Sequence, residues 1–327
     1  MPSTDSPLRY PGGKTQLAPL VSLLLTHNDL QGGHYAEPFA GGAGIAWRLL
    51  FAGQASEVWL NDIDPAVYAF WNAVVHHSEE MVERVQNAVI TMDEWQRQRT
   101  VFKDSSSKPV DRAFATFYMN RTNRSGILDG GVIGGNQQAG KYKLDCRFNR
   151  TDLARKIQRI ARYKDVIHLS NEDARLCLAR WDKSLPARAL INIDPPYYGK
   201  GSELYINHFK PSDHASLSLQ VRRLKHRWMM TYDDTVEIEC LYRACPTYRM
   251  SLLYSAQTKR QGAELLITDT QLELPSNTTE RKLQKTAEGS VGKEPQSCLS
   301  TFKPKRLSSG LLPRQNFEPL EASSARL

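Results

Sequence analysis

The sequence predicts an α/β protein with an open, mainly parallel sheet, because a strand, a glycine-rich turn and a helix follow one another near the N-terminus. Residues 35–37 read as the end of a short strand, 38–44 as the turn, and 45–51 as an apolar helix that opens from it. A second short strand, residues 57–60, ends next to Asp62. Strand, turn, helix, strand and terminal acid are typical of a βαβ unit that binds a nucleotide.

Further strands and helices follow from the same criteria of period and length. Strands are expected at residues 166–169, 189–193, 228–231 and 264–268, and helices at residues 67–92, 110–118 and 153–163. Residues 123–140 contain six glycines and are flanked by basic side chains. We therefore expect a pliable basic loop in that segment.

The strand pattern stops after residue 75 and resumes at residue 165, which predicts a sheet interrupted by an insertion. Residues 1–75 and 165–275 should form the sheet domain, and residues 76–164 a mainly helical inserted domain. Beyond residue 275 the composition turns to Ser, Thr, Pro, Lys and Glu with few apolar side chains. Residues 276–327 are therefore predicted to be a flexible basic tail.

Composition disfavours several classes of protein. The longest strongly apolar run, residues 20–25, is far shorter than the ~20 residues of a membrane helix, and the start does not resemble a signal peptide. We therefore expect a cytoplasmic protein. The five cysteines form no C-x-x-C pair and the eight histidines no H-x-x-x-H pair, so neither a disulfide framework nor a metal site is expected.

Positive charge is concentrated in one segment. The chain carries a formal net charge of +8, and residues 119–164 alone hold eleven basic against three acidic side chains, an excess of the same size. Such a concentration is typical of a nucleic-acid-binding segment. A solvated basic face is the alternative interpretation.

The sharpest motif is Asp194-Pro195-Pro196-Tyr197, which follows the expected strand 189–193. Ligands of open α/β sheets bind at the carboxyl ends of strands, so the motif lies where a site is expected. Two prolines remove two N–H donors and leave carbonyls free to accept hydrogen bonds. The Asp194 carboxylate and the Pro195 carbonyl can each accept one N–H of an exocyclic amino group, and Tyr197 offers a ring for base stacking. A rigid turn with a capping Asp is the alternative.

Two glycine segments are less specific. Gly41, Gly42 and Gly44 let a ligand approach the backbone, but their spacing is not G-x-G-x-x-G, which disfavours a nicotinamide or flavin enzyme. Asp62 stands where a carboxylate commonly binds ribose hydroxyls, with helix capping as the alternative. Residues 9–14 lack the first glycine of a P-loop, so a nucleoside triphosphatase is a poor fit.

Five motifs occur together in one order. They are Tyr10-Pro11-Gly12-Gly13-Lys14, Glu37-Pro38-Phe39-Ala40-Gly41-Gly42, Asn61-Asp62-Ile63-Asp64, Asn120-Arg121 with Ser125-Gly126, and Asp194-Pro195-Pro196-Tyr197. Their combination resembles the Dam-like adenine-specific DNA methyltransferases. The order, with the glycine motif first and D-P-P-Y last, is similar to the α group of amino-methyltransferases, and the likeness spans about residues 8–270.

This resemblance implies a Rossmann-like methyltransferase sheet, S-adenosyl-L-methionine as cofactor, duplex DNA as partner and a helical recognition domain within residues 76–164. It implies that Tyr10, Lys14, Asp62 and Asp194 contact the cofactor, with Glu37, Phe39, Gly41 and Gly42 of the glycine motif beside it. A further family motif falls at residues 170–173, which makes Asp173 a candidate for the adenine edge of the cofactor.

The implied reaction transfers a methyl group to N6 of an adenine that the enzyme flips out of the duplex. Asp194, Pro195, Pro196 and Tyr197 would form the catalytic pocket, and no covalent intermediate is required. Contacts to DNA are expected from Asn120, Arg121, Arg124, Lys141, Lys143, Arg147 and Arg150. Among these, Arg124 is a candidate for a guanine edge and most of the others for phosphates.

Residues 121–135 differ from the corresponding loop of members that modify GATC, so that recognition sequence is not assigned. The resemblance implies action as a monomer.

Other functions remain open at this stage. An N4-cytosine methyltransferase and an RNA amino-methyltransferase would bind the same kind of amine, although Asp rather than Ser at position 194 favours adenine. A DNA-binding protein that retains an inactive methyltransferase core is the alternative from a different class. The presence of Tyr10, Lys14 and Asp62 argues against a decayed site.

Overall fold

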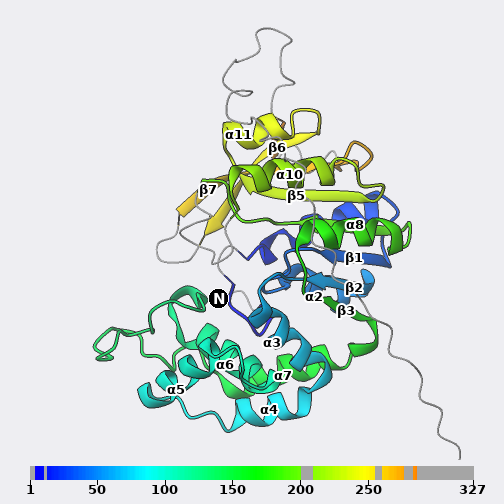
Figure 1. Ribbon diagram of the computed structural model, residues 1–327. Helices are drawn as coiled ribbons and strands as arrows, with labels where there is room; N and C mark the ends of the chain where they lie inside the picture. Colours follow the sequence, from blue (N-terminus) through cyan, green and yellow to red (C-terminus); the bar gives the residue numbers. More distant parts are fainter. Residues whose placement is uncertain (1–3, 11–12, 200–208, 255–259, 276–282, 286–327) are drawn as a thin grey trace, which may run out of the picture. The chain divides into compact units, whose positions relative to one another are not determined.

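The computed structural model describes residues 4–10, 13–199, 209–254, 260–275 and 283–285 (Figure 1). Their strands form one eight-stranded sheet in the order β3-β2-β1-β4-β5-β7-β6-β8. The first five strands of this order are parallel, and β7, β6 and β8 continue the sheet with antiparallel pairings. The strands are β1 Gly33–Glu37, β2 Ala55–Asn61, β3 Ile167–Ser170, β4 Ala189–Ile193, β5 Arg227–Asp233, β6 Thr247–Tyr254, β7 Arg260–Thr268 and β8 Leu283–Lys285.

The strand order confirms the predicted α/β class and the Rossmann-like sheet. From β1 the chain moves outward to β2 and β3, and then returns to add β4 and β5 on the other side of β1. This reversal between β1 and β4 is the switch point at which ligands bind in doubly wound sheets. The carboxyl ends of these two strands are therefore the place to look for a site.

Helices cover both faces of the sheet, and each face has its own apolar core. Leu190 of β4 belongs to the core shared with α1, α2 and α3, whereas Ile191 and Ile193 belong to the core beneath α8, α10 and α11. This alternation follows from the two-residue period of a strand. The helices are α1 Ala18–His27, α2 Gly44–Phe51, α3 Pro65–His76, α4 Ser78–Gln86, α5 Met92–Lys103, α6 Pro109–Thr122, α7 Arg150–Ala161, α8 Ala174–Ser184, α10 Pro211–Val221 and α11 Val236–Leu241.

Several predicted elements differ from those observed. The single helix expected at residues 67–92 is wrong, because the chain leaves helical geometry at His77 (φ −130°, ψ 37°) and divides into α3 and α4. A separate helix, α5, then begins after Thr91, whose side chain accepts a hydrogen bond from the Glu94 amide. Strand β6 was not predicted, and β7 begins four residues before the expected strand at 264.

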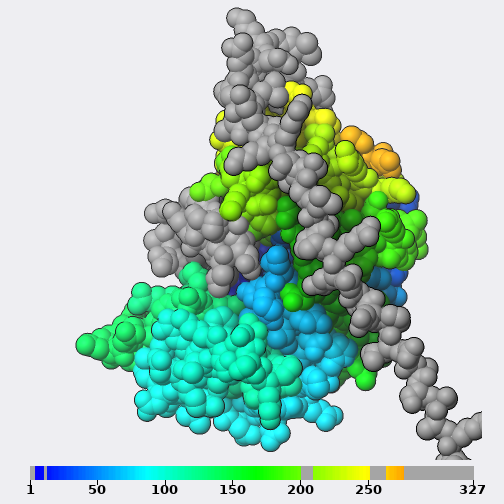
Figure 2. Space-filling view, in the orientation of Figure 1, coloured from blue at the N-terminus to red at the C-terminus, as the bar shows by residue number. Residues whose placement is uncertain are grey.

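The helices of the predicted insertion, α4 to α7, pack against α3 of the sheet half. Phe70 of α3 stacks on Phe117 of α6 with ring centroids 5.6 Å apart, and Phe148 lies 5.5 Å from Phe117. All three side chains belong to the same core as the strands beneath α1 and α2. Figure 2 shows the surface of this helical group adjoining that of α3. The proposed domain boundary at residue 76 thus runs through continuous apolar packing.

Three residues of the predicted tail, Leu283–Lys285, form strand β8 on the edge of β6. The rest of residues 276–327 lies outside the described residues. Within the part of the chain that the structure describes, no helix is long and apolar enough to cross a membrane.

Phe117→Ala should destabilise both halves together, because Phe117 joins the helical group to α3. Removing a buried Phe side chain costs about 3–5 kcal/mol of unfolding free energy. Urea unfolding followed by tryptophan fluorescence should show one transition at lower urea concentration, and Val89→Ala, at a side chain that is 59% exposed, should leave it in place. Two separate transitions, of which only one shifts, would contradict a shared core.

Candidate active site

Three predicted acidic residues meet at the carboxyl edge of the sheet. Glu37 is the last residue of β1, and Asp62 and Asp194 directly follow β2 and β4. Both of these strands pair with β1 in parallel, so their ends lie side by side. The structure thus gathers residues that are far apart in the sequence at the switch point of the sheet.

Asp62 fixes the glycine turn. Its Oδ2 accepts a hydrogen bond from the Gly41 amide at 2.8 Å, and its Oδ1 accepts one from the Asp64 amide at 2.9 Å. The Gly41 carbonyl in turn accepts the indole N–H of Trp71 at 2.8 Å. Burial raises the pKa of Asp62 to about 6, although both backbone hydrogen bonds lower it.

The Tyr10 ring lies on this turn. Gly41 has a positive φ of 47°, and a Cβ built on it would come within 2.7 Å of the Tyr10 ring. A larger residue at position 41 would therefore displace the ring and strain the backbone. Gly42 is also close, because its Cβ would meet the Tyr10 Cβ at 3.1 Å. Phe39 is half-buried beside the turn, with its ring 5.8 Å from that of Phe209.

Asp194 uses one carboxylate oxygen for internal contacts. Its Oδ1 accepts hydrogen bonds from Lys14 Nζ at 3.2 Å and from Thr231 Oγ1 at 2.7 Å. Among the described residues, no hydrogen bond or ion pair engages its Oδ2, and the side chain is 27% exposed. Pro195 is buried and Pro196 half-buried behind it. Asp194 is thus held firmly and keeps one oxygen available to a ligand.

Lys14 is buried among acceptors. Its Nζ lies 2.8 Å from the Tyr197 hydroxyl and 3.0 Å from Glu264 Oε1, in addition to Asp194. The Tyr197 hydroxyl also donates a hydrogen bond to Glu264. Burial raises the pKa of Glu264 and Asp194 adds to the rise, whereas the Lys14 ammonium opposes it. The structure therefore brings Lys14, Tyr197 and Asp194 of two separate motifs together, with Glu264 as an additional member.

Glu37 stands behind Asp194 in the interior. It is 6% exposed and accepts a hydrogen bond from the Tyr35 hydroxyl at 3.0 Å. Burial raises the pKa of Glu37 to about 8, and the nearby negative charge of Asp194 contributes to the increase. Glu37 is therefore largely protonated at neutral pH.

Asp173 caps a helix. Its Oδ1 accepts a hydrogen bond from the Arg175 amide at 2.8 Å at the start of α8, and its Oδ2 pairs with the Arg175 guanidinium at 2.7 Å. Hydrogen bonds from the Arg175 side chain lower the pKa of Asp173. The residue lies at the carboxyl edge, after β3, as predicted, but most of its hydrogen-bonding capacity serves α8.

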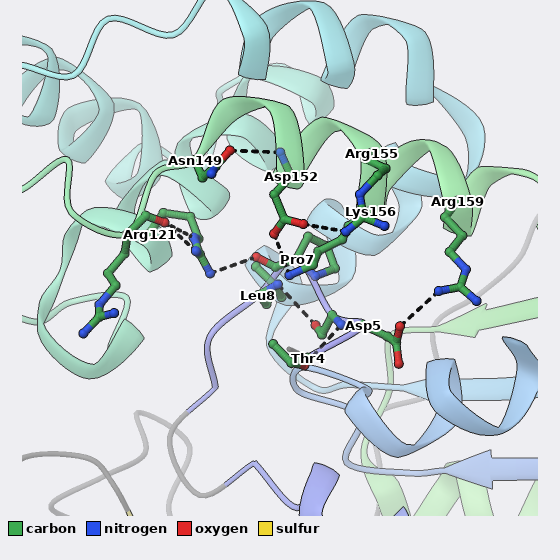
Figure 3. A network of polar contacts seen from close by, with 12 residues as sticks. Thr4, Asp5, Pro7, Leu8, Arg121, Asn149, Asp152, Arg155, Lys156 and Arg159 are labelled. Atoms are coloured by element: carbon green, nitrogen blue, oxygen red, sulfur yellow. Dashed lines mark hydrogen bonds and ion pairs between the residues drawn. The ribbon is translucent and has the colours of Figure 1, made fainter. Parts of the chain in front are cut away.

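Two of the predicted DNA contacts are occupied inside the protein. Asn120 is 1% exposed and exchanges two hydrogen bonds with the backbone of Arg9, each 2.7 Å long. Arg121 donates to the carbonyls of Arg147 and Pro7, and Figure 3 shows its guanidinium directed at Pro7. Burial lowers the pKa of Arg121 to about 10, and Arg9 adds to that effect. These side chains attach the N-terminal segment to α6.

The remaining candidates lie on or beside residues 123–149, here called the basic loop. Arg124, Lys141 and Lys143 are exposed on it, and Arg147 is half-buried. Lys141 Nζ lies 5.8 Å from the Tyr142 ring centroid, and the Arg147 guanidinium lies 5.9 Å from it. Arg150, also exposed, donates to the Ala88 carbonyl from the start of α7. The structure therefore leaves a smaller set of surface cations than the sequence suggested.

Three residues of the site were not predicted. Glu264 and Thr231 bind Lys14 and Asp194, and Asp233 at the end of β5 accepts the amides of Tyr198 and Gly199, each at 2.8 Å. A signal existed for Glu264 and Thr231, since each is a polar residue directly beside a run of apolar residues in a strand. Such residues are buried only where they have partners.

Glu37→Gln should change how stability depends on pH. The Glu37 carboxyl has a pKa near 8 in the fold, against an ordinary value of 4.5. This difference stabilises the folded protein fully below pH 4.5, and the contribution is lost as the pH rises through 8. Between these values the wild-type unfolding free energy should fall by up to about 1.4 kcal/mol per pH unit, and Glu37→Gln should remove that slope. Urea unfolding at several pH values measures it, with exposed Glu83→Gln as control. An equal slope in both variants would contradict a buried, protonated Glu37.

Solved structures give only weak matches. The Pyrococcus horikoshii protein PH1948 is 9% identical, with a TM-score of 0.38 over 80% of this chain and 84% of that one. TrmN from Thermus thermophilus is 15% identical, with a TM-score of 0.32 over 78% of this chain and 48% of that one. The fold class is established by the strand order β3-β2-β1-β4-β5 with its switch point between β1 and β4.

Sequence comparisons are more specific. Type II methyltransferase M.MjaIII of Methanocaldococcus jannaschii is 24% identical over 206 residues, which cover 58% of this chain and 68% of that protein. Residues 10–259, more than three quarters of the chain, match the family described as D12 class N6 adenine-specific DNA methyltransferase. The resemblance inferred from the five motifs is thereby confirmed. The chain belongs to the D12 class of N6 adenine-specific DNA methyltransferases.

Proposed function

We propose that the pocket at Asp194 receives N6 of an adenine flipped out of duplex DNA and directs its methylation, with S-adenosyl-L-methionine as the methyl donor. The observation that carries this proposal is that the two oxygens of the Asp194 carboxylate differ in their contacts. Lys14 and Thr231 hold Oδ1, whereas Oδ2 has no partner among the described residues. A fixed acceptor with one unengaged oxygen suits an exocyclic amine.

The residues at the carboxyl edge fit a nucleoside cofactor. Each Asp62 oxygen accepts one backbone hydrogen bond and retains a further lone pair, so the carboxylate can still accept from ribose hydroxyls. The glycine turn with Gly41 lies beside it, the Tyr10 ring lies on that turn, and Phe39 adds a half-buried aromatic surface. We propose that these residues hold the cofactor, which supplies an activated methyl group when bound.

The chain contributes positioning and fixed charge to the reaction. Asp194 Oδ2 and the Pro195 carbonyl would each accept one N6 hydrogen, which directs the nitrogen lone pair out of the plane of the base. As positive charge develops on N6, the carboxylate is already in place and needs no reorganisation. The proton that N6 finally loses can be accepted at Asp194 Oδ2, since this side chain is 27% exposed.

Extruding a paired base costs a few kcal/mol, which phosphate contacts must offset. We propose that the exposed cations of the basic loop, Arg124, Lys141 and Lys143, supply these contacts together with Arg147. Asn120 and Arg121 support this surface from beneath, since their side chains bind backbone groups.

Asp194→Ala should lower methyl transfer by at least about 100-fold, the usual loss when a preorganised polar group is removed from a reacting centre. The assay uses methyl-labelled cofactor and unmethylated genomic DNA, followed by digestion to nucleosides and identification of the labelled base. Thermal unfolding and cofactor titration control for folding and for binding. Wild-type label in N4-methylcytosine would contradict the adenine substrate, and a variant with near-normal turnover would contradict the role of Asp194.

Replacing both Lys141 and Lys143 with Ala should weaken binding to every DNA sequence alike. Each lost phosphate contact reduces the slope of log K against log salt by about 0.9, so the double variant should lower it by about 2. Fluorescence anisotropy with a labelled duplex at several salt concentrations measures the slope. Lys183→Ala, at an exposed position on α8, is the matched control. A slope equal to that of the wild type would remove the two lysines from the DNA-binding surface.

A further inference from the structure

Glu264 is a buried carboxylate that none of the sequence motifs contains. It lies on β7, is 2% exposed and stands beyond residue 259, where the family match ends. Lys14 Nζ is 3.0 Å from both of its carboxylate oxygens, and the Tyr197 hydroxyl donates to Oε1. A buried charge is tolerated where partners replace its lost hydration, and Lys14 and Tyr197 provide that replacement here.

The approach of Lys14 to Asp194 depends on its other acceptors. Besides Asp194 Oδ1 at 3.2 Å, the ammonium has the Tyr197 hydroxyl at 2.8 Å and Glu264 at 3.0 Å. A lysine side chain is flexible and its charge demands strong acceptors. If the Glu264 charge were removed, the ammonium would be drawn towards the remaining carboxylate, where Oδ2 lies within reach of a small movement.

We propose that Glu264 is a positioning residue for methyl transfer, which holds Lys14 so that Asp194 Oδ2 stays available to the substrate amine. This role rests on the proposed function, because Asp194 needs an unengaged oxygen only if it accepts a hydrogen from that amine. The negative charge of Glu264 should also favour methyl transfer. Methylation places positive charge on the amine nitrogen, and two carboxylates around one ammonium leave a net negative charge that stabilises it.

The geometry of β7 supplies a matched pair of variants. Glu264→Gln retains the shape of the side chain and removes its charge. Thr268 lies on the same face of β7, four residues further on. It is fully buried, and its hydroxyl has no hydrogen-bond partner among the residues that the structure describes. Thr268→Val therefore perturbs the strand to a similar degree without affecting Lys14.

We expect Glu264→Gln to lower the single-turnover rate of methyl transfer about 10- to 100-fold. This is the loss typical of residues that orient a functional side chain through a hydrogen bond, such as those behind metal ligands. The dissociation constants for cofactor and DNA should change by less than about threefold, because a lost transition-state interaction reduces the rate and not binding. Thr268→Val should retain the wild-type rate. If Glu264→Gln proves unstable, Glu264→Asp takes its place. This variant keeps the charge, should fold, and should transfer methyl groups faster than Glu264→Gln but more slowly than the wild type.

A Lys14→Met background tests whether Glu264 acts through Lys14. In that background Glu264→Gln should slow transfer no further, because the side chain that Glu264 positions is absent. An equal fold-loss in both backgrounds would overturn the inference, and so would a Glu264→Gln rate equal to that of Thr268→Val in an active protein. A wild-type protein that methylates no DNA would instead overturn the proposed function, and this role with it.

Discussion

The compensation of buried charge at Lys14 is the interaction on which the rest of the site depends. One ammonium joins three parts of the chain: the segment before α1, the end of β4 and the middle of β7. Neither Lys14 nor Glu264 could be buried as a charged group alone, because an unpaired ion in the interior is strongly destabilising. The same contact that allows these charges to be buried also assembles the site. Folding of the chain therefore places the polar groups of the site in their final positions.

The sheet adds a second constraint. Parallel strands end at a common edge, so the topology alone gathers the acids after β1, β2 and β4 without any direct bond between them. Burial raises the pKa of Glu37, and the nearby negative charge of Asp194 adds to the rise. A largely neutral Glu37 behind Asp194 reduces the repulsion that three ionised carboxylates would create.

Sequence reasoning succeeded where chemistry is local. Strand ends and the D-P-P-Y motif are short-range signals, and they placed Asp62 and Asp194 at the carboxyl ends of two strands, where the structure has them. It failed where the decisive neighbour is distant along the chain. Glu264 meets Lys14 across 250 residues, and Arg121 looks like any other surface cation until the fold places backbone carbonyls around it. Periodicity also could not show that His77 breaks a helix, because the apolar pattern continues on both sides.

The close approach of Gly126 to Arg9 restricts how the basic loop can change. Gly126 has a φ of 80°, and a Cβ at this position would lie 2.1 Å from the Arg9 carbonyl oxygen, directly before the Tyr10 ring that covers the glycine turn. The basic loop is thus fitted to the N-terminal segment as well as to α6. A loop transplanted from a relative would carry its own backbone path at this junction. Exchange of the basic loop should therefore preserve the fold only when the residues around Arg9 are exchanged with it.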